Sequence, residues 1–285
     1  MILENTKPFQ KIKDHSVSGE TFELRYNEDL DLVFTHPQPT SNALPKYYDS
    51  VDYISHTDGA RTFFEKMYQI VKNRALKNKL QLVNSASQKG VVLDIGAGTG
   101  DFLSVLKKDG WETIGIEPNE KAKAIAVSKG VTFVNELLDL ENKSFDAITM
   151  WHVLEHVPDV QTQIVELKRL LKPNGTLFIA VPNFNSFDAN YYGGFWAAFD
   201  VPRHLWHFSK TAIKKLFLIQ NLEVVKVLPM KFDSYYVSLL SEKYKTGTMN
   251  FFKAFLIGWK SNRYGNRNLE YSSHIYVIKN SKNAK

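Results

Sequence analysis

Strand-like and helix-like segments alternate through the middle of the chain, and this alternation limits the possible folds more than any other feature. Short apolar runs of the kind found in buried parallel strands are separated by segments with helical periodicity. Such alternation predicts an α/β protein with a doubly wound, Rossmann-like sheet and a ligand site at the carboxyl ends of its strands. The expected strands are Val91–Ile95, Thr113–Ile116, Val131–Val134, Phe145–Met150 and Thr176–Val181, and the expected helices between them are Asp101–Lys108, Asn119–Ser128 and Gln161–Leu171.

The first of these strands leads into a glycine-rich turn, Gly96-Ala97-Gly98-Thr99-Gly100, which opens a helix. Glycines let the backbone turn tightly and come close to a ligand that side chains would exclude. The fingerprint of dinucleotide enzymes, G-x-G-x-x-G, needs its third glycine one position later, where this chain has Asp101. The spacing here is G-x-G-x-G, and Asp94 stands two residues before the first glycine.

This pattern resembles motif I of the class I S-adenosylmethionine-dependent methyltransferases. The resemblance implies that the glycine turn lies beneath the methionine part of the cofactor and that Asp94 helps to hold its ammonium group. Glu117 ends the second strand 23 residues beyond Asp94, where the family binds the adenosine ribose. A carboxylate there can accept hydrogen bonds from both ribose hydroxyls. S-adenosyl-L-methionine is therefore the predicted cofactor, and its predicted contacts are Asp94, Gly96, Ala97, Gly98, Gly100, Glu117 and Pro118.

The resemblance is close over residues 90–182 and looser to about 225. It implies that Glu136 and Leu137 border the adenine and that Trp151 and His152 lie close to the cofactor. It also implies a seven-stranded, mostly parallel sheet with an antiparallel last strand. The branch most similar to this chain is that of the ubiquinone-biosynthesis O-methyltransferases, in a bacterial, Bacteroidetes-type form with a cysteine-free N-terminal head.

Residues 182–208 follow the fifth strand, are rich in aromatic side chains and are too long for an ordinary connection. We expect this acceptor loop to bind the molecule that receives the methyl group, because it leaves the carboxyl edge of the sheet. Its Pro202-Arg203-His204 is similar to a segment of the same branch. An equally weighted alternative is structural, with Asp200 pairing with Arg203 to fix the loop. The candidate substrate contacts are Tyr191, Tyr192, Trp196, Arg203 and His207.

Methyl transfer is an in-line displacement at a sulfonium carbon, so the protein mainly positions the reactants. An oxygen or nitrogen acceptor can also need a general base, whereas an acidic carbon acceptor needs none. His204 and His156 are the candidate catalytic bases, because histidine titrates near neutrality; a structural role for His156 is the alternative.

His152-x-x-Glu155-His156 also has an inverted zincin spacing, in which two imidazoles can share a metal. Because this run follows a strand that already fits the methyltransferase sheet, and because a third ligand would have to come from elsewhere, no metal is predicted.

The chain contains no cysteine, which excludes disulfides, thiolate catalysis and cysteine-ligated zinc. Residues 1–56 are expected to form a head and a cofactor-lid segment. The head resembles that of relatives with a zinc ribbon, but without cysteines it must be held by packing of Phe22, Leu24, Leu32 and Phe34. Tyr53 and His56 are expected either to close the cofactor site or, more simply, to pack as ordinary side chains.

Residues 57–285 are expected to form the methyltransferase domain. Within it we place a core at 90–230, the acceptor loop at 182–208, a helical insert at 231–268 and the last strand at 271–279. The insert lies between two expected strands, Glu223–Leu228 and His274–Ile278. Its amphipathic helices are rich in lysine, which suggests peripheral contact with an anionic membrane or partner, although an ordinary core stripe with solvated lysines is the simpler interpretation.

The net charge of +6 is unevenly distributed along the chain. Residues 231–285 hold ten basic and three acidic side chains, whereas the other 230 residues hold 26 basic and 27 acidic ones. The body of the protein is therefore nearly neutral, and we expect no nucleic-acid partner. Because no secretory signal or membrane-spanning run is evident, a cytoplasmic location is expected.

These observations predict an enzyme that transfers a methyl group from S-adenosylmethionine to a small or medium-sized acceptor, with O-methylation favoured. An RNA methyltransferase is one alternative, but it is disfavoured by the neutral body and by the absence of an Asn-Pro-Pro-Tyr motif. A second alternative is a regulator or scaffold that binds the cofactor without turnover. The acceptor and the oligomeric state cannot be read from the sequence.

Overall fold

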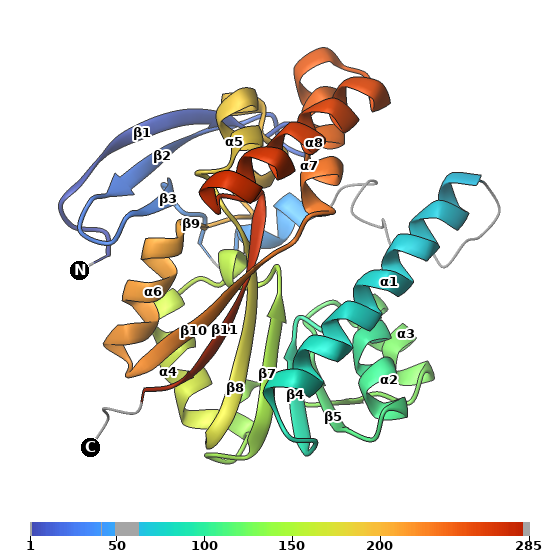
Figure 1. Cartoon of the computed structure of the whole chain (residues 1–285). Coiled ribbons are helices and arrows are strands. Elements are labelled where there is room, and N and C mark those ends of the chain that lie inside the picture. Colours follow the sequence, from blue (N-terminus) through green and yellow to red (C-terminus); the bar gives the residue numbers. More distant parts are fainter. Residues whose placement is uncertain (1, 41, 49–62, 282–285) are drawn as a thin grey trace.

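The computed structural model describes residues 2–40, 42–48 and 63–281. Its centre is a seven-stranded sheet with the order β10-β11-β8-β7-β4-β5-β6 (Figure 1). Strands β4 to β8 run parallel, and β11 is antiparallel to both of its neighbours. The predicted doubly wound sheet with an antiparallel last strand is thus confirmed. Its strands are β4 (Val91–Ile95), β5 (Glu112–Ile116), β6 (Thr132–Phe133), β7 (Phe145–Trp151), β8 (Leu171–Pro182), β10 (Leu222–Pro229) and β11 (Ser273–Asn280).

Helices cover both faces of this sheet, so its central strands are buried on two sides. Successive residues of β4 show this, because Val92 belongs to an apolar cluster with α1, α2 and α3, whereas Leu93 belongs to another with α4 and α6. Side chains alternate between the faces of a strand, so a strand covered on both faces is apolar at nearly every position, and Asp94 is the exception in β4. The helices are α1 (Phe63–Ala86), α2 (Asp101–Lys108), α3 (Glu120–Ser128), α4 (Val160–Leu170) and α6 (Lys210–Ile219).

The N-terminal residues form a second, four-stranded sheet with the order β1-β2-β3-β9. The first three strands are β1 (Thr6–Lys13), β2 (Thr21–Asn27) and β3 (Leu32–His36). The fourth, β9 (Trp206–Phe208), comes from the predicted acceptor loop and pairs antiparallel with β3. The head therefore shares a sheet with the rest of the chain. The expected packing residues of the head are buried, namely Phe22, Leu24, Leu32 and Phe34.

Two predictions about the N-terminal part fall outside the described residues. The boundary at 56/57 lies there, as do Tyr53 and His56, so the division into domains and the closing role of these side chains stay predictions.

The expected helical insert is a hairpin of α7 (Asp233–Thr246) and α8 (Phe251–Asn268), between β10 and β11. Gly247 ends α7 in the left-handed region with φ 79°, and the Asn250 side chain caps α8 by accepting the Lys253 N–H. Figure 1 shows the hairpin, α5 (Phe187–Tyr192) and the head sheet beyond the carboxyl ends of the parallel strands. No helix among the described residues is long and apolar enough to cross a membrane.

Single-turn 3-10 helices complete the structure at this end of the sheet. They are η1 (Leu44–Tyr48), η3 (Leu137–Asp139), η4 (Leu154–His156), η5 (Gly193–Phe195) and η6 (Ala197–Phe199).

Candidate cofactor and active site

The glycine turn between β4 and α2 has the backbone conformation that its spacing predicted. Gly96, Gly98 and Gly100 have φ values of 72°, 53° and 73°, in the left-handed region that favours glycine. A Cβ at Gly96 would lie 2.4 Å from the Val153 Cγ2 atom, whereas a Cβ at Gly98 would meet nothing within 4 Å. Gly96 is thus needed for packing, and the backbone at Gly98 is open to a ligand.

Glu117 follows β5 and reaches directly to this turn. Its Oε2 accepts a hydrogen bond of 2.7 Å from the Gly98 N–H, and its Oε1 accepts one of 2.9 Å from the Asn119 N–H. An ionised carboxylate has about four lone-pair positions, so both oxygens can accept further hydrogen bonds. The structure therefore brings together two features that lie 19 residues apart in the sequence.

Asp94 is a buried carboxyl group at the end of β4, and the Thr149 hydroxyl of β7 donates a hydrogen bond to it. Burial raises the pKa of Asp94 to about 7, although Thr149 and the nearby Lys79 act in the opposite direction. Removing this group from water is costly unless a positive partner is present. Asp94 is thus poised to receive a cationic ligand group.

Lys79 of α1 supplies a positive charge beside Asp94, and the sequence analysis missed it. Its Nζ lies 4.2 Å from the centre of the Trp151 ring, at the end of β7. Burial lowers its pKa to about 8, against the opposing influence of Asp94 and Asp233. No local motif marks a lone lysine on a long helix, and only the fold places it here.

Trp151 and His152 lie where β7 ends. Trp151 Nε1 is buried and has no hydrogen-bond partner among the described residues. His152 has φ 59°, an uncommon conformation for a residue with a side chain. Its Nε2 lies 3.0 Å from Asp233 Oδ2, and its Nδ1 lies 3.3 Å from Glu155 Oε1.

These two carboxylates determine the charge of His152. Burial alone would lower its pKa, but Asp233 and Glu155 outweigh burial and raise the pKa to about 10. His152 is therefore an imidazolium at neutral pH, with both ring nitrogens acting as donors. Asp233 belongs to the insert and was not anticipated from the sequence.

Glu136 and Leu137 follow β6 at the same edge of the sheet. Glu136 is exposed, whereas Leu137 is half-buried and its carbonyl accepts a hydrogen bond of 2.8 Å from an Arg169 Nη. Pro118 follows Glu117 directly. The predicted cofactor residues are therefore gathered at the carboxyl ends of four neighbouring strands, β7, β4, β5 and β6. Their individual roles stay predictions.

The two candidate bases, His156 and His204, are in contact, with ring centres 4.5 Å apart. His156 Nδ1 lies 3.0 Å from the Arg203 carbonyl and 3.1 Å from the Tyr48 hydroxyl, and His204 Nδ1 lies 2.9 Å from the Ala198 carbonyl. Because a carbonyl only accepts hydrogen bonds, these contacts place a proton on Nδ1 of each ring, so the neutral form of each ring carries its lone pair on Nε2. Burial, followed by His156, lowers the His204 pKa well below its usual value.

Glu155 joins these two histidines in a compact donor set. One donor atom from each of Glu155, His156 and His204 lies within 4.8 Å of the other two, and Glu155 Oε2 has no hydrogen-bond partner among the described residues. This set differs from the sequence motif, because His152 is bound to Asp233 and His204 takes its place. The absence of a metal from the active site stays a prediction, and a metal titration followed at these three residues tests it.

The candidate substrate residues divide into buried and accessible ones. The Tyr192 hydroxyl lies 3.1 Å from Glu242, Trp196 Nε1 donates to Asp188 at 2.8 Å, and His207 Nε2 lies 3.2 Å from the Thr35 hydroxyl. Burial lowers the pKa of His207 to about 3. Tyr191 is the accessible member, with 39% of its surface exposed.

Arg203 is bound on both sides by the protein. Its guanidinium pairs with Asp200 and donates a hydrogen bond of 2.8 Å to the Ser16 hydroxyl of the head. The pairing of Asp200 with Arg203, which was the structural alternative, is thus present, and with the bond to Ser16 it fixes the acceptor loop against the head. A direct substrate contact for Arg203 and for the other candidates stays a prediction.

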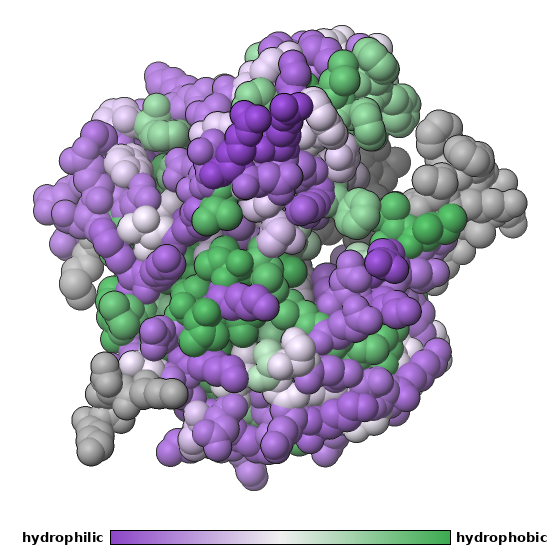
Figure 2. Space-filling view, viewed as in Figure 1, coloured by the Kyte–Doolittle hydropathy of each residue, from purple (hydrophilic) through white to green (hydrophobic). Residues whose placement is uncertain are grey.

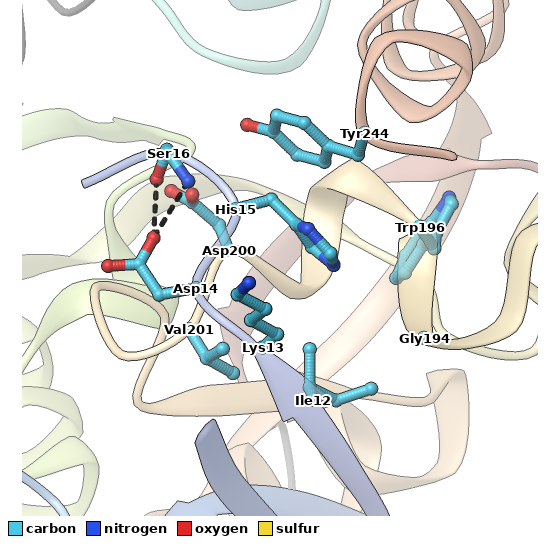
Figure 3. A pocket seen from close by; sticks show the side chains of 10 residues that line it. All are labelled: Ile12, Lys13, Asp14, His15, Ser16, Gly194, Trp196, Asp200, Val201 and Tyr244. Carbon is cyan, nitrogen blue, oxygen red and sulfur yellow. Dashed lines mark hydrogen bonds between the residues drawn. The ribbon is translucent and has the colours of Figure 1, made fainter. Parts of the chain in front are cut away.

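A small pocket lies where the head, the acceptor loop and α7 meet (Figure 3). The His15 ring stacks on Tyr244 of α7, with centres 5.2 Å apart and ring planes 20° apart. Trp196 lines this pocket, whereas none of the predicted cofactor residues does. The pocket therefore belongs to the contact between these three segments and lies apart from the glycine turn.

Comparisons with known proteins agree with this geometry. The family described as "Methyltransferase domain" matches residues 66–227, which is more than half of the chain. The ubiquinone biosynthesis O-methyltransferase of Hahella chejuensis is 33% identical over 104 residues, covering 33% of this chain and 44% of that protein. The protein of the same name from Actinobacillus pleuropneumoniae is 29% identical over 169 residues, covering 54% of this chain and 72% of that protein.

Among solved structures, magnesium protoporphyrin IX methyltransferase from Synechocystis PCC 6803 shares the fold, with a TM-score of 0.52 and 16% identity over 83% of this chain and 92% of that one. The chain spans about half the length of the first curated relatives that it matches. The family match, the order of the sheet and the G-x-G-x-G turn agree, and the chain belongs to the methyltransferase domain family.

Proposed function

We propose that this protein transfers a methyl group from S-adenosylmethionine to a small or medium-sized acceptor, with an oxygen acceptor favoured. The observation that carries the proposal is the hydrogen bond from the Gly98 N–H to Glu117, next to the buried Asp94. The preference for oxygen is supported by the printed names of the curated relatives. A cytoplasmic location and the absence of a nucleic-acid partner stay predictions.

The residues at the glycine turn fit this cofactor. The backbone at Gly98 faces open space, and Trp151 Nε1 is a buried donor that lacks a partner among the described residues. Asp94 and Lys79 offer opposite charges side by side, which suits the ammonium and carboxylate groups of a methionine. The bound cofactor supplies an activated methyl group on a sulfonium.

Each part of the cofactor has a partner in this arrangement. Asp94 would bind the ammonium group, Lys79 the carboxylate and Glu117 the ribose hydroxyls. Glu136 and Leu137 would border the adenine. The charged groups of the protein thereby orient the sulfonium without chemistry of their own.

His156 is the better candidate base of the two histidines. It is half-buried, and the Arg203 carbonyl orients its ring so that the Nε2 lone pair remains available. His204 is buried and its pKa is far below neutrality, so it accepts a proton poorly. In this proposal His204 packs against His156 and positions it, while Tyr191 contributes to the acceptor site.

Calorimetric titration with S-adenosylhomocysteine tests cofactor binding directly. Glu117→Ala should weaken binding about tenfold or more, because it removes charge-assisted acceptors. Glu120→Ala is the matched control, since Glu120 is an exposed acid in the first turn of the next helix. Absence of binding by the unaltered protein would refute the proposal. If the protein binds the cofactor but transfers no methyl group to any component of a cell extract, the result would instead favour a regulator or scaffold that binds the cofactor without turnover.

A further inference from the structure

The outer face of α8 is more hydrophobic than its buried face. The side chains that point inward are small or polar, apart from one isoleucine, namely Ala254, Ile257, Gly258, Ser261, Asn262 and Gly265. The outward side chains include Phe252, Phe255 and Trp259, with 76%, 58% and 44% of their surface exposed. An ordinary surface helix has the opposite polarity. Large exposed apolar faces of this kind mark interaction sites.

The neighbouring helix extends the same surface. The buried positions of α7 are Ser234, Ser238, Ser241 and Glu242, whereas Tyr236 is exposed. Figure 2 shows hydrophobic residues gathered over the free end of the α7–α8 hairpin, at the upper right. We call five exposed apolar residues on one side of α8 the aromatic face; they are Phe251, Phe252, Phe255, Leu256 and Trp259.

Basic side chains border the aromatic face. Lys260, Arg263 and Arg267 are exposed on α8, and Lys245 is exposed at the end of α7. Residues 231–268 are all described and contain only two acids, of which Glu242 is fully buried and Asp233 is bound to His152. The exposed charge of the hairpin is therefore positive.

We propose that the aromatic face of α8 docks onto the surface of an anionic lipid bilayer. Two features bind a helix in the plane of such a membrane. One is a face of aromatic and aliphatic side chains, and the other is a border of Lys and Arg. Charge complementarity selects this occupant over a second copy of the chain. A two-fold interface places the same patch on both subunits, so the positive charges of Lys260 and Arg263 from both copies would be gathered in one interface.

The hairpin that carries the aromatic face also contacts the candidate active site. Asp233, the first residue of α7, holds His152, and the Ser241 hydroxyl accepts a hydrogen bond of 2.9 Å from the Ala197 N–H in the acceptor loop. The α7–α8 hairpin thus carries the aromatic face and also contacts both His152 and the acceptor loop.

Co-sedimentation of the full chain with vesicles tests the proposal. We expect binding to vesicles of phosphatidylglycerol and phosphatidylcholine in equal parts, little binding to pure phosphatidylcholine, and loss of binding at about 1 M salt. The double variant Phe252→Ser, Phe255→Ser should bind at least about tenfold more weakly, because two aromatic anchors are lost. Lys260→Ala with Arg263→Ala should weaken binding roughly fivefold per charge.

Matched controls lie on other exposed surfaces. Leu218→Ser with Ile219→Ser removes two exposed apolar residues of α6, and Lys108→Ala with Lys214→Ala removes two exposed charges. Both controls should bind vesicles like the unaltered protein. The proposal is overturned if the unaltered protein does not co-sediment with anionic vesicles, or if the α8 variants bind these vesicles as tightly as the control variants do. Light scattering provides the alternative outcome. If the unaltered protein is a dimer that does not bind vesicles, and the Phe252→Ser, Phe255→Ser variant is a monomer, the aromatic face belongs to an interface with a second copy of the chain.

Discussion

Asp94→Asn should stabilise the protein at neutral pH while it impairs cofactor binding. The folded-state pKa of Asp94 is raised from 3.8 to about 7, mainly by burial. Folding therefore favours the protonated carboxyl, and the folded protein loses stability as the pH rises from about 4 through 7. The loss is about 1.4 kcal/mol per pH unit, or at most about 4 kcal/mol in total. Asparagine avoids this cost and can still accept the Thr149 hydrogen bond.

Urea unfolding followed by circular dichroism between pH 4 and 8 measures this effect. The difference in unfolding free energy between Asp94→Asn and the unaltered protein should be near zero at pH 4 and grow to about 2–4 kcal/mol at pH 8. Asp159→Asn is a control of opposite sign, because hydrogen bonds from Thr162 and Gln161 hold the pKa of Asp159 below its usual value. A difference for Asp94→Asn that does not change with pH would refute the argument from burial.

The same substitution separates stability from function. The ammonium group of the cofactor favours the ionised carboxylate, so the affinity of the unaltered protein for S-adenosylhomocysteine should rise between pH 6 and 8. Asp94→Asn should lose this rise and bind roughly 10- to 100-fold more weakly at pH 8. Calorimetry on both proteins at each pH checks the prediction, and equal affinities would contradict the assignment of Asp94 to the ammonium.

Three further substitutions test neighbouring parts of the site. Lys79→Met should add up to about 3 kcal/mol to the free energy of unfolding at pH 7. The pKa of Lys79 is lowered to about 8, so the cost of burying its charge is present below that pH. Calorimetry should show a lower cofactor affinity for the same variant. Gly96→Ala should cost about 1–3 kcal/mol in urea unfolding, because its Cβ would meet Val153 at a positive φ. His156→Gln should lower methyl transfer about 100-fold or more in a turnover assay and leave the cofactor Kd unchanged.

The central sheet and its glycine turn could be predicted because each strand there carries a local signal. β4 and α2 have the bounds that were expected, since a strand buried on both faces is a continuous apolar run and a glycine turn marks its end. The start of β8 was missed, because Pro173 and Gly175 lie inside it and normally indicate a turn. Strand β1 was missed because most of its side chains are exposed and show no clear alternation.

Contacts between distant segments carried no local signal. Lys79 reaches the site from α1, which precedes the parallel strands in the sequence, and Asp233 reaches it from α7, which follows them. No sequence motif near either residue marks its position. His204 joins Glu155 and His156 only after the acceptor loop folds back. The inverted polarity of α8 was also hidden, because periodicity shows that a helix is amphipathic but does not show which face is turned inward.

The pairing of β3 with β9 has a consequence for how the chain folds during synthesis. The Thr35 hydroxyl bonds to the His204 carbonyl, 169 residues further along. A ribosome that adds about 5–20 residues per second would make β9 roughly 10–30 s after β3. Until then the outer edge of β3 has no partner strand and is open to pairing with another nascent chain. The head sheet is therefore completed only after most of the chain has been made.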